Sequence, residues 1–353
     1  MINYNIAVLG GDGIGPEVIG QAVRVLDKVA EKFKFKVAYK YYLVGGCSID
    51  KYGVPLTDKA FNEIAKADAV LLGAVGGVKW DTIAKEIRPE QALFKLRGGL
   101  KLFANLRPTL LFSELMDACP LKKEIIGDGL DILIVRELTG GIYFGKKWTE
   151  GDTANDMMSY SRQEIERIID VAINVARKRG GKITSVDKAN VLETSRLWRK
   201  IFEEKTKGLT DIKCNSLLVD NAAMQLVRNP KQFDVIVTEN LFGDILSDEA
   251  SMLTGSIGML PSASIGVGKF GMYEPIHGSA PDIAGKSIAN PIASILSVAM
   301  MMRYSFSRED IAVDIENAVK EALSRGARTS DISKKGEKTL NTVEMCDEIL
   351  KQF

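Results

Sequence analysis

Histidine is the scarcest chemically useful residue in this sequence. His277 is the only histidine among 353 residues. A catalytic site that needs a histidine–carboxylate pair, or a metal site with several imidazole ligands, would have to use that one side chain. This scarcity already narrows the chemistry that the chain can perform.

Cysteine is also rare, and its spacing is uninformative. The four cysteines are far apart and form no C-x-x-C pair; they are Cys47, Cys119, Cys214 and Cys346. This spacing argues against a zinc site or a disulfide framework and fits a reducing cytoplasm.

A charge excess of one sign and long apolar runs are lacking as well. The 47 Lys and Arg residues nearly balance the 46 Asp and Glu residues, so the net charge of +1 gives no footprint for nucleic acid or an acidic membrane surface. The longest apolar stretch, residues 291–302, is too short to span a bilayer and predicts a buried helix. The first residues contain no basic n-region or cleavage site. We expect a cytoplasmic protein without nucleic-acid or membrane partners.

Alternating strand-like and helical segments are what the chain does contain. Its length suggests two domains. The apolar runs 6–9, 37–42 and 69–72 alternate with helical patterns that begin at Pro16 and Asp58. This rhythm predicts an α/β fold with a largely parallel sheet. We expect domain boundaries near Leu102 and Thr254, although composition alone does not fix them. A mixture of Gly, aromatic and charged residues over 138–158 predicts an irregular hairpin or arm.

Four later apolar runs each end at a polar or charged residue; they are 131–136, 183–187, 216–220 and 234–238. Ligands of open α/β sheets bind at the carboxyl ends of the strands. Position alone therefore makes Arg136, the Asp187–Lys188 pair and Asp220 candidate site residues.

Three glycines after the first strand imitate a dinucleotide-binding loop. Gly11, Gly13 and Gly15 precede a helix, but Pro16 stands where the third glycine of G-x-G-x-x-G is required. Glu17 also places a carboxylate in the first helical turn, where a pyrophosphate would otherwise bind. We therefore expect no Rossmann-type binding.

A second motif, Tyr143 with Lys147, has the Y-x-x-x-K spacing of short-chain dehydrogenases. The N-terminal glycine pattern of those enzymes is missing, so a chance match is the better explanation. A metal-free short-chain reductase nevertheless remains an alternative.

Paired carboxylates give the strongest signal for a metal. Asp244 and Asp248 are four residues apart in a helical stretch and so share one face, and no Lys or Arg occurs between residues 232 and 268. Two carboxylates about 4 Å apart repel by about 4 kcal/mol at an effective dielectric near 20. A solvated acidic face is the simpler explanation, but Phe242, Ile245 and Leu246 argue against full solvation. We expect Mg²⁺ or Mn²⁺, with Asp220 as a plausible third ligand.

Three arginines could hold a dicarboxylate. Arg97, Arg107 and Arg136 each offer a planar fork that binds carboxylates bidentately, although a lone arginine is more often a surface ion-pair partner. Leu93 precedes Arg97 by one helical turn and would place an apolar contact beside its ligand, although a core leucine is the commoner explanation.

Ordered motifs along almost the whole chain closely resemble the β-decarboxylating dehydrogenase family, which includes isopropylmalate and isocitrate dehydrogenases. They are GDGIGPEV, GGVKWD, LFANLRP, VRELTGGIYFG, VDKANVL, VDNAAMQL, NLFGDILSDEA and EPIHGSAPDIAG. The resemblance implies two α/β domains around a mixed sheet, without a Rossmann unit. The first domain would comprise 1–102 and 257–353 and bind the cofactor. The second, 103–256, would carry the dimer interface, the metal ligands and the catalytic residues.

The resemblance also implies roles for individual residues. Lys188 and Tyr143 match the acid–base pair of the family. Three substrate-carboxylate clamps are implied, namely Arg97, Arg107 and Arg136, with Asn190 as a further polar contact. The divalent-metal ligands would be Asp220, Asp244 and Asp248. In the family homodimer, Lys188 and Asp220 reach the site of the neighbouring subunit.

The implied cofactor site lies along residues 77–90 and, more firmly, 278–290. His277 and Ile283 would flank the adenine. The full set of implied contacts is Ile14, Gly77, Glu90, Glu274, His277, Gly278, Ser279, Ala280, Asp282, Ile283 and Asn290. The single histidine would thus have a binding role and not a catalytic one.

Two positions distinguish members of the family. Asp282 matches the residue that accepts hydrogen bonds from both ribose hydroxyls, which favours NAD over NADP. Leu93 favours a substrate with an isopropyl group, because apolar burial of that group gains about 2 kcal/mol, whereas a carboxylate placed there loses solvation. We therefore expect isopropylmalate as the substrate. Isocitrate-, tartrate- and homoisocitrate-type activities, and a non-catalytic regulatory subunit, remain alternatives.

Overall fold

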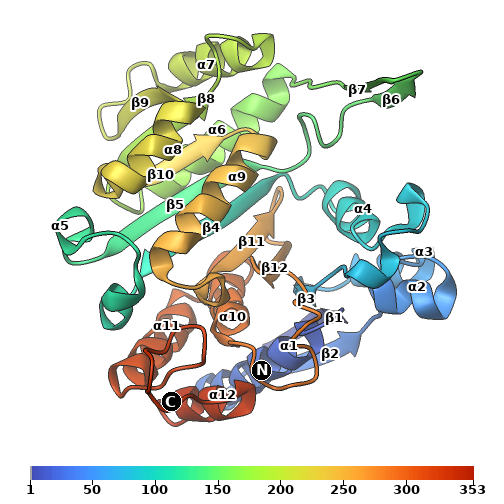
Figure 1. The fold of residues 1–353 in the computed structure, drawn as a ribbon, viewed down its shortest axis with the longest axis vertical. Helices are drawn as coiled ribbons and strands as arrows, with labels where there is room; N and C mark the ends of the chain where they lie inside the picture. Colours follow the sequence, from blue (N-terminus) through green and yellow to red (C-terminus); the bar gives the residue numbers. More distant parts are fainter. Residues whose placement is uncertain (1) are drawn as a thin grey trace. The chain divides into compact units, whose positions relative to one another are not determined.

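The chain forms two compact units in the computed structural model, which describes residues 2–353 (Figure 1). Unit 1 is Met1–Leu102 with Gly255–Phe353, and unit 2 is Phe103–Thr254. The second boundary therefore lies two residues before the position inferred from the resemblance.

Unit 1 contains a mixed sheet of five strands in the order β2-β1-β3-β12-β11. Its strands are β1 (Asn3–Gly11), β2 (Lys36–Tyr41), β3 (Ala69–Ala74), β11 (Pro261–Ile265) and β12 (Gly271–Pro275). The β1–β2, β1–β3 and β3–β12 pairs are parallel, whereas β11 and β12 form an antiparallel pair. The two ends of the chain thus build one sheet, because β3 pairs with β12.

Seven α-helices belong to the described part of unit 1. They are α1 (Gly15–Phe33), α2 (Gly46–Tyr52), α3 (Asp58–Ile64), α4 (Gln91–Gly99), α10 (Ile292–Tyr304), α11 (Glu309–Ser324) and α12 (Thr342–Leu350). In α1 the buried residues recur at helical spacing, so one face of this helix packs inward. In α10 every residue from Ile292 to Met302 is buried, which confirms the buried helix predicted from the apolar stretch.

In unit 2, five strands lie in the order β4-β5-β10-β8-β9. Its strands are β4 (Ala104–Leu111), β5 (Leu130–Glu137), β8 (Lys182–Asp187), β9 (Lys213–Leu218) and β10 (Val235–Thr238). Only the β4–β5 pair is antiparallel among these. The sheets are therefore mixed, as the resemblance implied, and less uniformly parallel than the strand–helix rhythm suggested.

The helices of unit 2 are α5 (Lys123–Ile126), α6 (Arg162–Ala176), α7 (Glu193–Thr206), α8 (Val219–Arg228) and α9 (Asn240–Ser251). A capping box of Ser161 and Glu164 starts α6. Within 138–158, β6 (Lys147–Glu150) and β7 (Thr153–Asp156) form an antiparallel hairpin, which matches the predicted arm.

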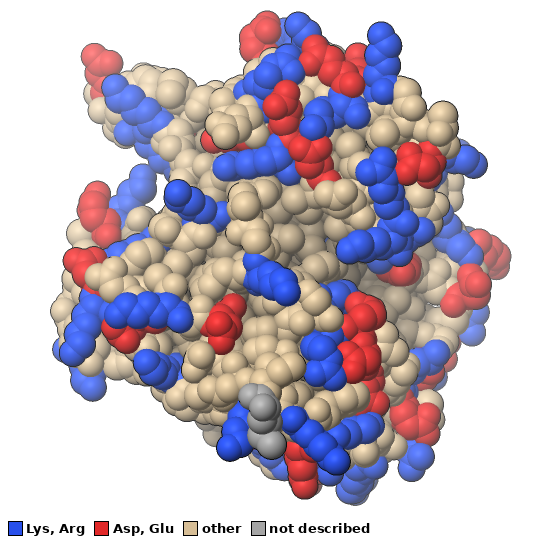
Figure 2. All heavy atoms as spheres, turned by 180° about the vertical axis from the view of Figure 1, so that it is seen from behind, with Lys and Arg blue, Asp and Glu red and all other residues tan. Residues whose placement is uncertain are grey.

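On the face drawn in Figure 2, basic and acidic side chains are interspersed and not gathered by sign. Among the helices of the described residues, none has both the length and the apolar character that a membrane span requires.

Candidate active site

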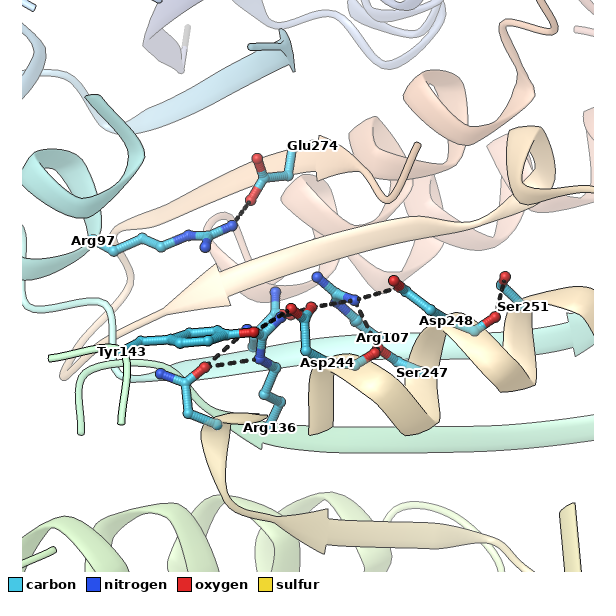
Figure 3. A network of polar contacts seen from close by, with 11 residues as sticks. Arg97, Arg107, Arg136, Tyr143, Asp244, Ser247, Asp248, Ser251 and Glu274 are labelled. Carbon is cyan, nitrogen blue, oxygen red and sulfur yellow. Dashed lines mark hydrogen bonds and ion pairs between the residues drawn. The ribbon is translucent and has the colours of Figure 1, made fainter. Parts of the chain in front are cut away.

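Two aspartates and two arginines meet in unit 2, where α9 packs on β4 and β5 (Figure 3). Arg107 Nη1 on β4 lies 3.2 Å from Asp248 Oδ1 and 3.4 Å from Asp244 Oδ1. Arg136 on β5 forms an ion pair with Asp244 through its Nη1. Asn105 pairs with Arg136 across the strands, and Arg107 is two residues beyond Asn105, so both arginines project from the same face of the sheet.

This arrangement corrects one expectation about the aspartates. Their own helix supplies no positive charge, as predicted, but Arg107 and Arg136 provide it from neighbouring strands. A metal ion is therefore not required merely to hold Asp244 and Asp248 together. Burial raises the pKa of the Asp248 carboxyl, with Arg107 opposing the shift and Asp244 adding to it.

Tyr143 belongs to the same cluster. Its hydroxyl donates a 2.9 Å hydrogen bond to Asp244 Oδ2. Burial raises the pKa of the Tyr143 phenol, and the nearby Asp244 carboxylate adds to the shift. The hydroxyl therefore keeps its proton at neutral pH and can act as a donor.

The Y-x-x-x-K motif does not form a catalytic pair. Lys147 Nζ donates to the main-chain carbonyl oxygen of Tyr143 at 3.1 Å, and not to its hydroxyl. The tyrosine hydroxyl is directed at Asp244 instead. A short-chain reductase mechanism has no support in this geometry.

Lys188 and Asp220 form a separate pair in unit 2. Lys188 Nζ lies 2.6 Å from Asp220 Oδ1, and this hydrogen bond lowers the pKa of the Asp220 carboxyl. Asp220 is in the first turn of α8 and not at a strand end, because β9 stops at Leu218. Asn190 is exposed nearby in the chain.

Within one chain, the three proposed metal ligands do not converge. Over residues 2–353, no three His, Cys, Asp or Glu side chains are grouped as a metal site. Asp244 and Asp248 share α9, whereas Asp220 pairs with Lys188. A three-aspartate site therefore needs a ligand from elsewhere, which is what the resemblance implied for the neighbouring subunit.

In unit 1, Arg97 on α4 pairs with a buried carboxylate. Its Nη2 lies 3.0 Å from Glu274 Oε1 on β12 (Figure 3). Its Nε is buried and has no hydrogen-bond partner among the described residues. Leu93 is partly buried and packs against the hydrophobic core of unit 1. It therefore is a core leucine, and its contact with the substrate stays a prediction.

Four residues predicted to contact the cofactor come together beside the start of α1. The Ile14 amide donates to the Ser279 carbonyl oxygen at 2.8 Å. Ile14 also forms a small apolar cluster with Val18 and Ala289, against which Ala280 and Ile283 pack. The loop after β12 and the turn after β1 therefore form one surface.

His277 adds an unsatisfied polar atom to this loop. Its Nδ1 lies 2.9 Å from the Gly278 carbonyl oxygen, and its buried Nε2 has no partner among the described residues. Burial lowers the pKa of the imidazole, so the ring is neutral at physiological pH. A neutral aromatic ring with one free polar atom fits contact with an adenine base.

The remaining predicted cofactor contacts differ in how exposed their side chains or backbone are. Asp282 and Gly278 are exposed, as is Glu90 just before α4. Gly77 has a φ of 155° and directly precedes a short 3₁₀ turn, Val78–Trp80. By contrast, Asn290 is buried and donates to Asp331 Oδ2 at 3.0 Å while accepting from the Ile292 amide. The Asn290 side chain therefore already forms hydrogen bonds within the protein.

A sequence model of isocitrate/isopropylmalate dehydrogenases matches residues 5–349. The chain belongs to this family. A 3-isopropylmalate dehydrogenase of Clostridium acetobutylicum is 56% identical over 349 residues, covering 98% of this chain and 98% of the relative. One of Pseudomonas putida is 56% identical, covering 99% of this chain and 98% of the relative.

Solved structures agree with the family assignment. An isocitrate dehydrogenase of Methylococcus capsulatus superposes with a TM-score of 0.86 at 34% identity, covering 99% of both chains. A β-decarboxylating dehydrogenase of Thermococcus kodakarensis gives 0.81 at 38% identity, covering 99% of this chain and 96% of that one. The fold inferred from the resemblance is confirmed, and the chain is an oxidoreductase of this family.

Sequence reasoning missed residues that position the family's site. Asn240, at the start of α9, accepts hydrogen bonds from Arg136 Nε at 3.1 Å and Nη2 at 2.8 Å, and donates to the Gly140 carbonyl oxygen at 3.2 Å. The buried Glu137 accepts from the Thr139 and Gly140 amides. No sequence pattern marks Asn240 as an acceptor, because its partner Arg136 is more than a hundred residues away in the chain.

Proposed function

We propose that this enzyme oxidises 3-isopropylmalate at C2, reduces NAD and releases CO₂ to leave 4-methyl-2-oxopentanoate, a step of leucine biosynthesis. The observation that carries the proposal is the near-complete coverage by 3-isopropylmalate dehydrogenases at 54–57% identity. The cluster of Arg107, Arg136, Tyr143, Asp244 and Asp248 supports it, because guanidinium groups bind carboxylates and a phenol can supply a proton.

Substrate recognition follows from the arginines and from Leu93. We assign the substrate carboxylates to Arg107 and Arg136, with Arg97 and Asn190 as further proposed contacts. The isopropyl group is assigned to Leu93. Its apolar burial is worth about 2 kcal/mol, whereas a third carboxylate at that place would lose several kcal/mol of hydration.

The donor set of α9 fits a hard divalent cation. Asp244 and Asp248 offer carboxylate oxygens on one helical face, which suits Mg²⁺ or Mn²⁺. Asp220 of a second subunit would complete the set. Bound there, the cation would polarise the C2–oxygen bond and offset negative charge on that oxygen.

Two side chains carry the proposed proton transfers. Lys188 Nζ, which lies beside Asp220, is assigned to accept the proton of the C2 hydroxyl in its neutral form, a form that a bound divalent cation nearby would favour. Bound NAD would supply the acceptor for the hydride of C2. After loss of CO₂, the Tyr143 hydroxyl donates a proton to C3. The geometry supports this role, because the Tyr143 hydroxyl carries a proton and its 2.9 Å hydrogen bond to Asp244 directs it into the arginine–aspartate cluster.

NAD is assigned to the surface around Ile14 and the loop after β12. The neutral His277 and the apolar Ile283 are the proposed adenine contacts, and the exposed Asp282 is the proposed ribose acceptor. The other proposed contacts are Gly77, Glu90, Glu274, Gly278, Ser279, Ala280 and Asn290. The carboxylate of Asp282 would repel a 2′-phosphate, so NADP is disfavoured.

A homodimer with shared active sites completes the proposal. Large apolar side chains are exposed on the two helices of unit 2 that carry the proposed metal ligands: Met224 and Val227 on α8, Ile245 and Met252 on or just after α9. Exposed apolar groups on packed helices are typical of a protein interface. A second copy would cover them and bring its Lys188 and Asp220 to this chain's aspartates.

The test is NADH formation with 3-isopropylmalate, isocitrate, tartrate and homoisocitrate in parallel, with and without EDTA. We expect rapid turnover with 3-isopropylmalate alone, abolished by the chelator and restored by excess Mg²⁺ or Mn²⁺. Preference for one of the other acids would contradict the substrate assignment. Full turnover after complete metal removal would contradict the metal assignment.

A further inference from the structure

Asp12, in the GDGIGPE turn after β1, is a buried carboxylate that receives three main-chain amides. Its Oδ2 accepts from Gly46 N and Gly76 N, each at 2.8 Å, and its Oδ1 accepts from Cys47 N at 2.8 Å. Only 4% of Asp12 is exposed. One side chain therefore joins the start of α2 to the loop that follows β3.

That loop is also fastened to α2 from outside. The Trp80 ring lies where a Cβ of Gly46 would be, because such an atom would fall 2.2 Å from it. Lys79 Nζ and Trp80 Nε1 both donate to Asp50 on α2, at 2.6 Å and 3.1 Å. The segment from Gly76 to Trp80 is thus held at both ends, by the buried Asp12 at Gly76 and by Asp50 at Lys79 and Trp80.

The residues that follow Asp12 hold the other cofactor loop. Ile14 N donates to the Ser279 carbonyl oxygen at 2.8 Å, and a Cβ on Gly13 would fall 1.9 Å from the same oxygen. Glu17 accepts a hydrogen bond from the Gly285 amide. The glycine-rich turn packs against protein backbone, which explains its glycines without any bound pyrophosphate.

We propose that Asp12 is a positioning residue for NAD, because it sets the loop at Gly76–Gly77 relative to the loop at Ser279–Gly285. This inference rests on the proposed function for the identity of the cofactor. Asp12 itself contacts no ligand; it acts through the backbone of Gly76.

A carboxylate suits this position better than an amide would. Its two oxygens provide about four acceptor sites, enough for three amide donors. In an Asp12→Asn variant, one oxygen would be replaced by an NH₂ group that faces an N–H donor. At least one of the three hydrogen bonds would then be lost, and the loops would be less well ordered.

The test compares NAD binding and steady-state kinetics of the wild type and Asp12→Asn. We expect the Kd and the KM for NAD to rise about tenfold, because NAD binding would then have to order loops that the wild type already holds in place. The kcat and the KM for 3-isopropylmalate should stay close to wild type. Ser48→Ala is the matched control, because it removes the hydrogen bond from the buried Ser48 hydroxyl on the same helix to the Val54 carbonyl oxygen and leaves the Gly76 amide untouched.

Equal NAD affinity in Asp12→Asn and wild type would overturn the proposal, as would the same KM rise in Ser48→Ala. If Asp12→Asn does not fold, amide hydrogen exchange of the wild type tests the proposal instead. NAD should slow the exchange of amides 45–47 and 76–80 together, and unchanged exchange in both segments would overturn the proposal. Wild type that binds NAD without oxidising 3-isopropylmalate would refute the proposed function alone.

Discussion

The two units organise their polar groups in opposite ways. In unit 1 backbone groups are held in the candidate cofactor loops: three backbone amides donate to the Asp12 carboxylate, and the Ile14 amide donates to the Ser279 carbonyl oxygen. In unit 2 the candidate catalytic cluster is made of charged side chains, with Arg107 shared between two aspartates. In unit 2 each ion pair depends on particular charged side chains, so replacing one of them removes its contacts directly. In unit 1 the surface depends on the groups that hold the backbone in place, so replacing a side chain at the surface leaves most of it unchanged. Substitutions of contact residues should therefore have larger effects in unit 2 than in unit 1.

Replacing Lys188 with Met should give the largest effect. It removes the proposed proton acceptor, so kcat for 3-isopropylmalate should fall about a hundredfold to ten-thousandfold, the range for lost acid–base catalysis. Lys147→Met is the matched control, because the Lys147 ammonium donates to the main-chain carbonyl oxygen of Tyr143 and not to its hydroxyl. A near-normal rate for Lys188→Met, or inactivity of Lys147→Met, would reverse the assignment.

Glu239→Gln should change the pH dependence of stability. Glu239 is fully buried before α9, and burial raises its pKa from 4.5 to about 7, with the nearby Asp187 adding to the shift and a hydrogen bond from Ser195 opposing it. The folded chain thus favours the protonated acid, and the stability this provides is lost as pH rises from 4.5 through about 7.

Between about pH 5 and about pH 8 the free energy of unfolding of Glu239→Gln should therefore rise by about 2.5 kcal/mol relative to that of the wild type, at roughly 1.4 kcal/mol per pKa unit. Urea denaturation at both pH values measures this difference. The exposed Glu150→Gln on the arm is the control and should show no such change. An identical pH response of wild type and Glu239→Gln would contradict the assignment to this buried group.

Asp282→Asn should give the smallest effect. Removing the carboxylate that would repel a 2′-phosphate should raise the ratio of kcat/KM for NADP to that for NAD about tenfold. Asp310→Asn, a change to a surface acid that pairs with Arg308, is the matched control. An unchanged cofactor ratio would show that Asp282 does not contact the ribose.

Local structure was predicted well from the sequence, because the spacing of apolar residues along the chain determines which segments form strands and helices. Strands such as 183–187 and the helical face shared by Asp244 and Asp248 follow from periodicity alone. The compensating charge on those aspartates could not be predicted, because Arg107 and Arg136 reach them only after β4 and β5 pair. Asp12 and Asn240 were missed for the same reason, since each is defined by partners distant in the chain. The family motifs supplied the candidate roles that periodicity could not.

Unit 1 takes its strands from both ends of the chain, and this has a consequence for folding order. Unit 2 is complete as soon as Thr254 has emerged from the ribosome, whereas β3 must wait for β12 at Gly271–Pro275 and the helices α10, α11 and α12 of unit 1 follow later still. Within unit 2, β4 packs against Met252–Thr254, so its folding brings its own two ends together. The central unit can therefore fold first and shorten the loop that unit 1 has to close, which lowers the entropic barrier to its assembly.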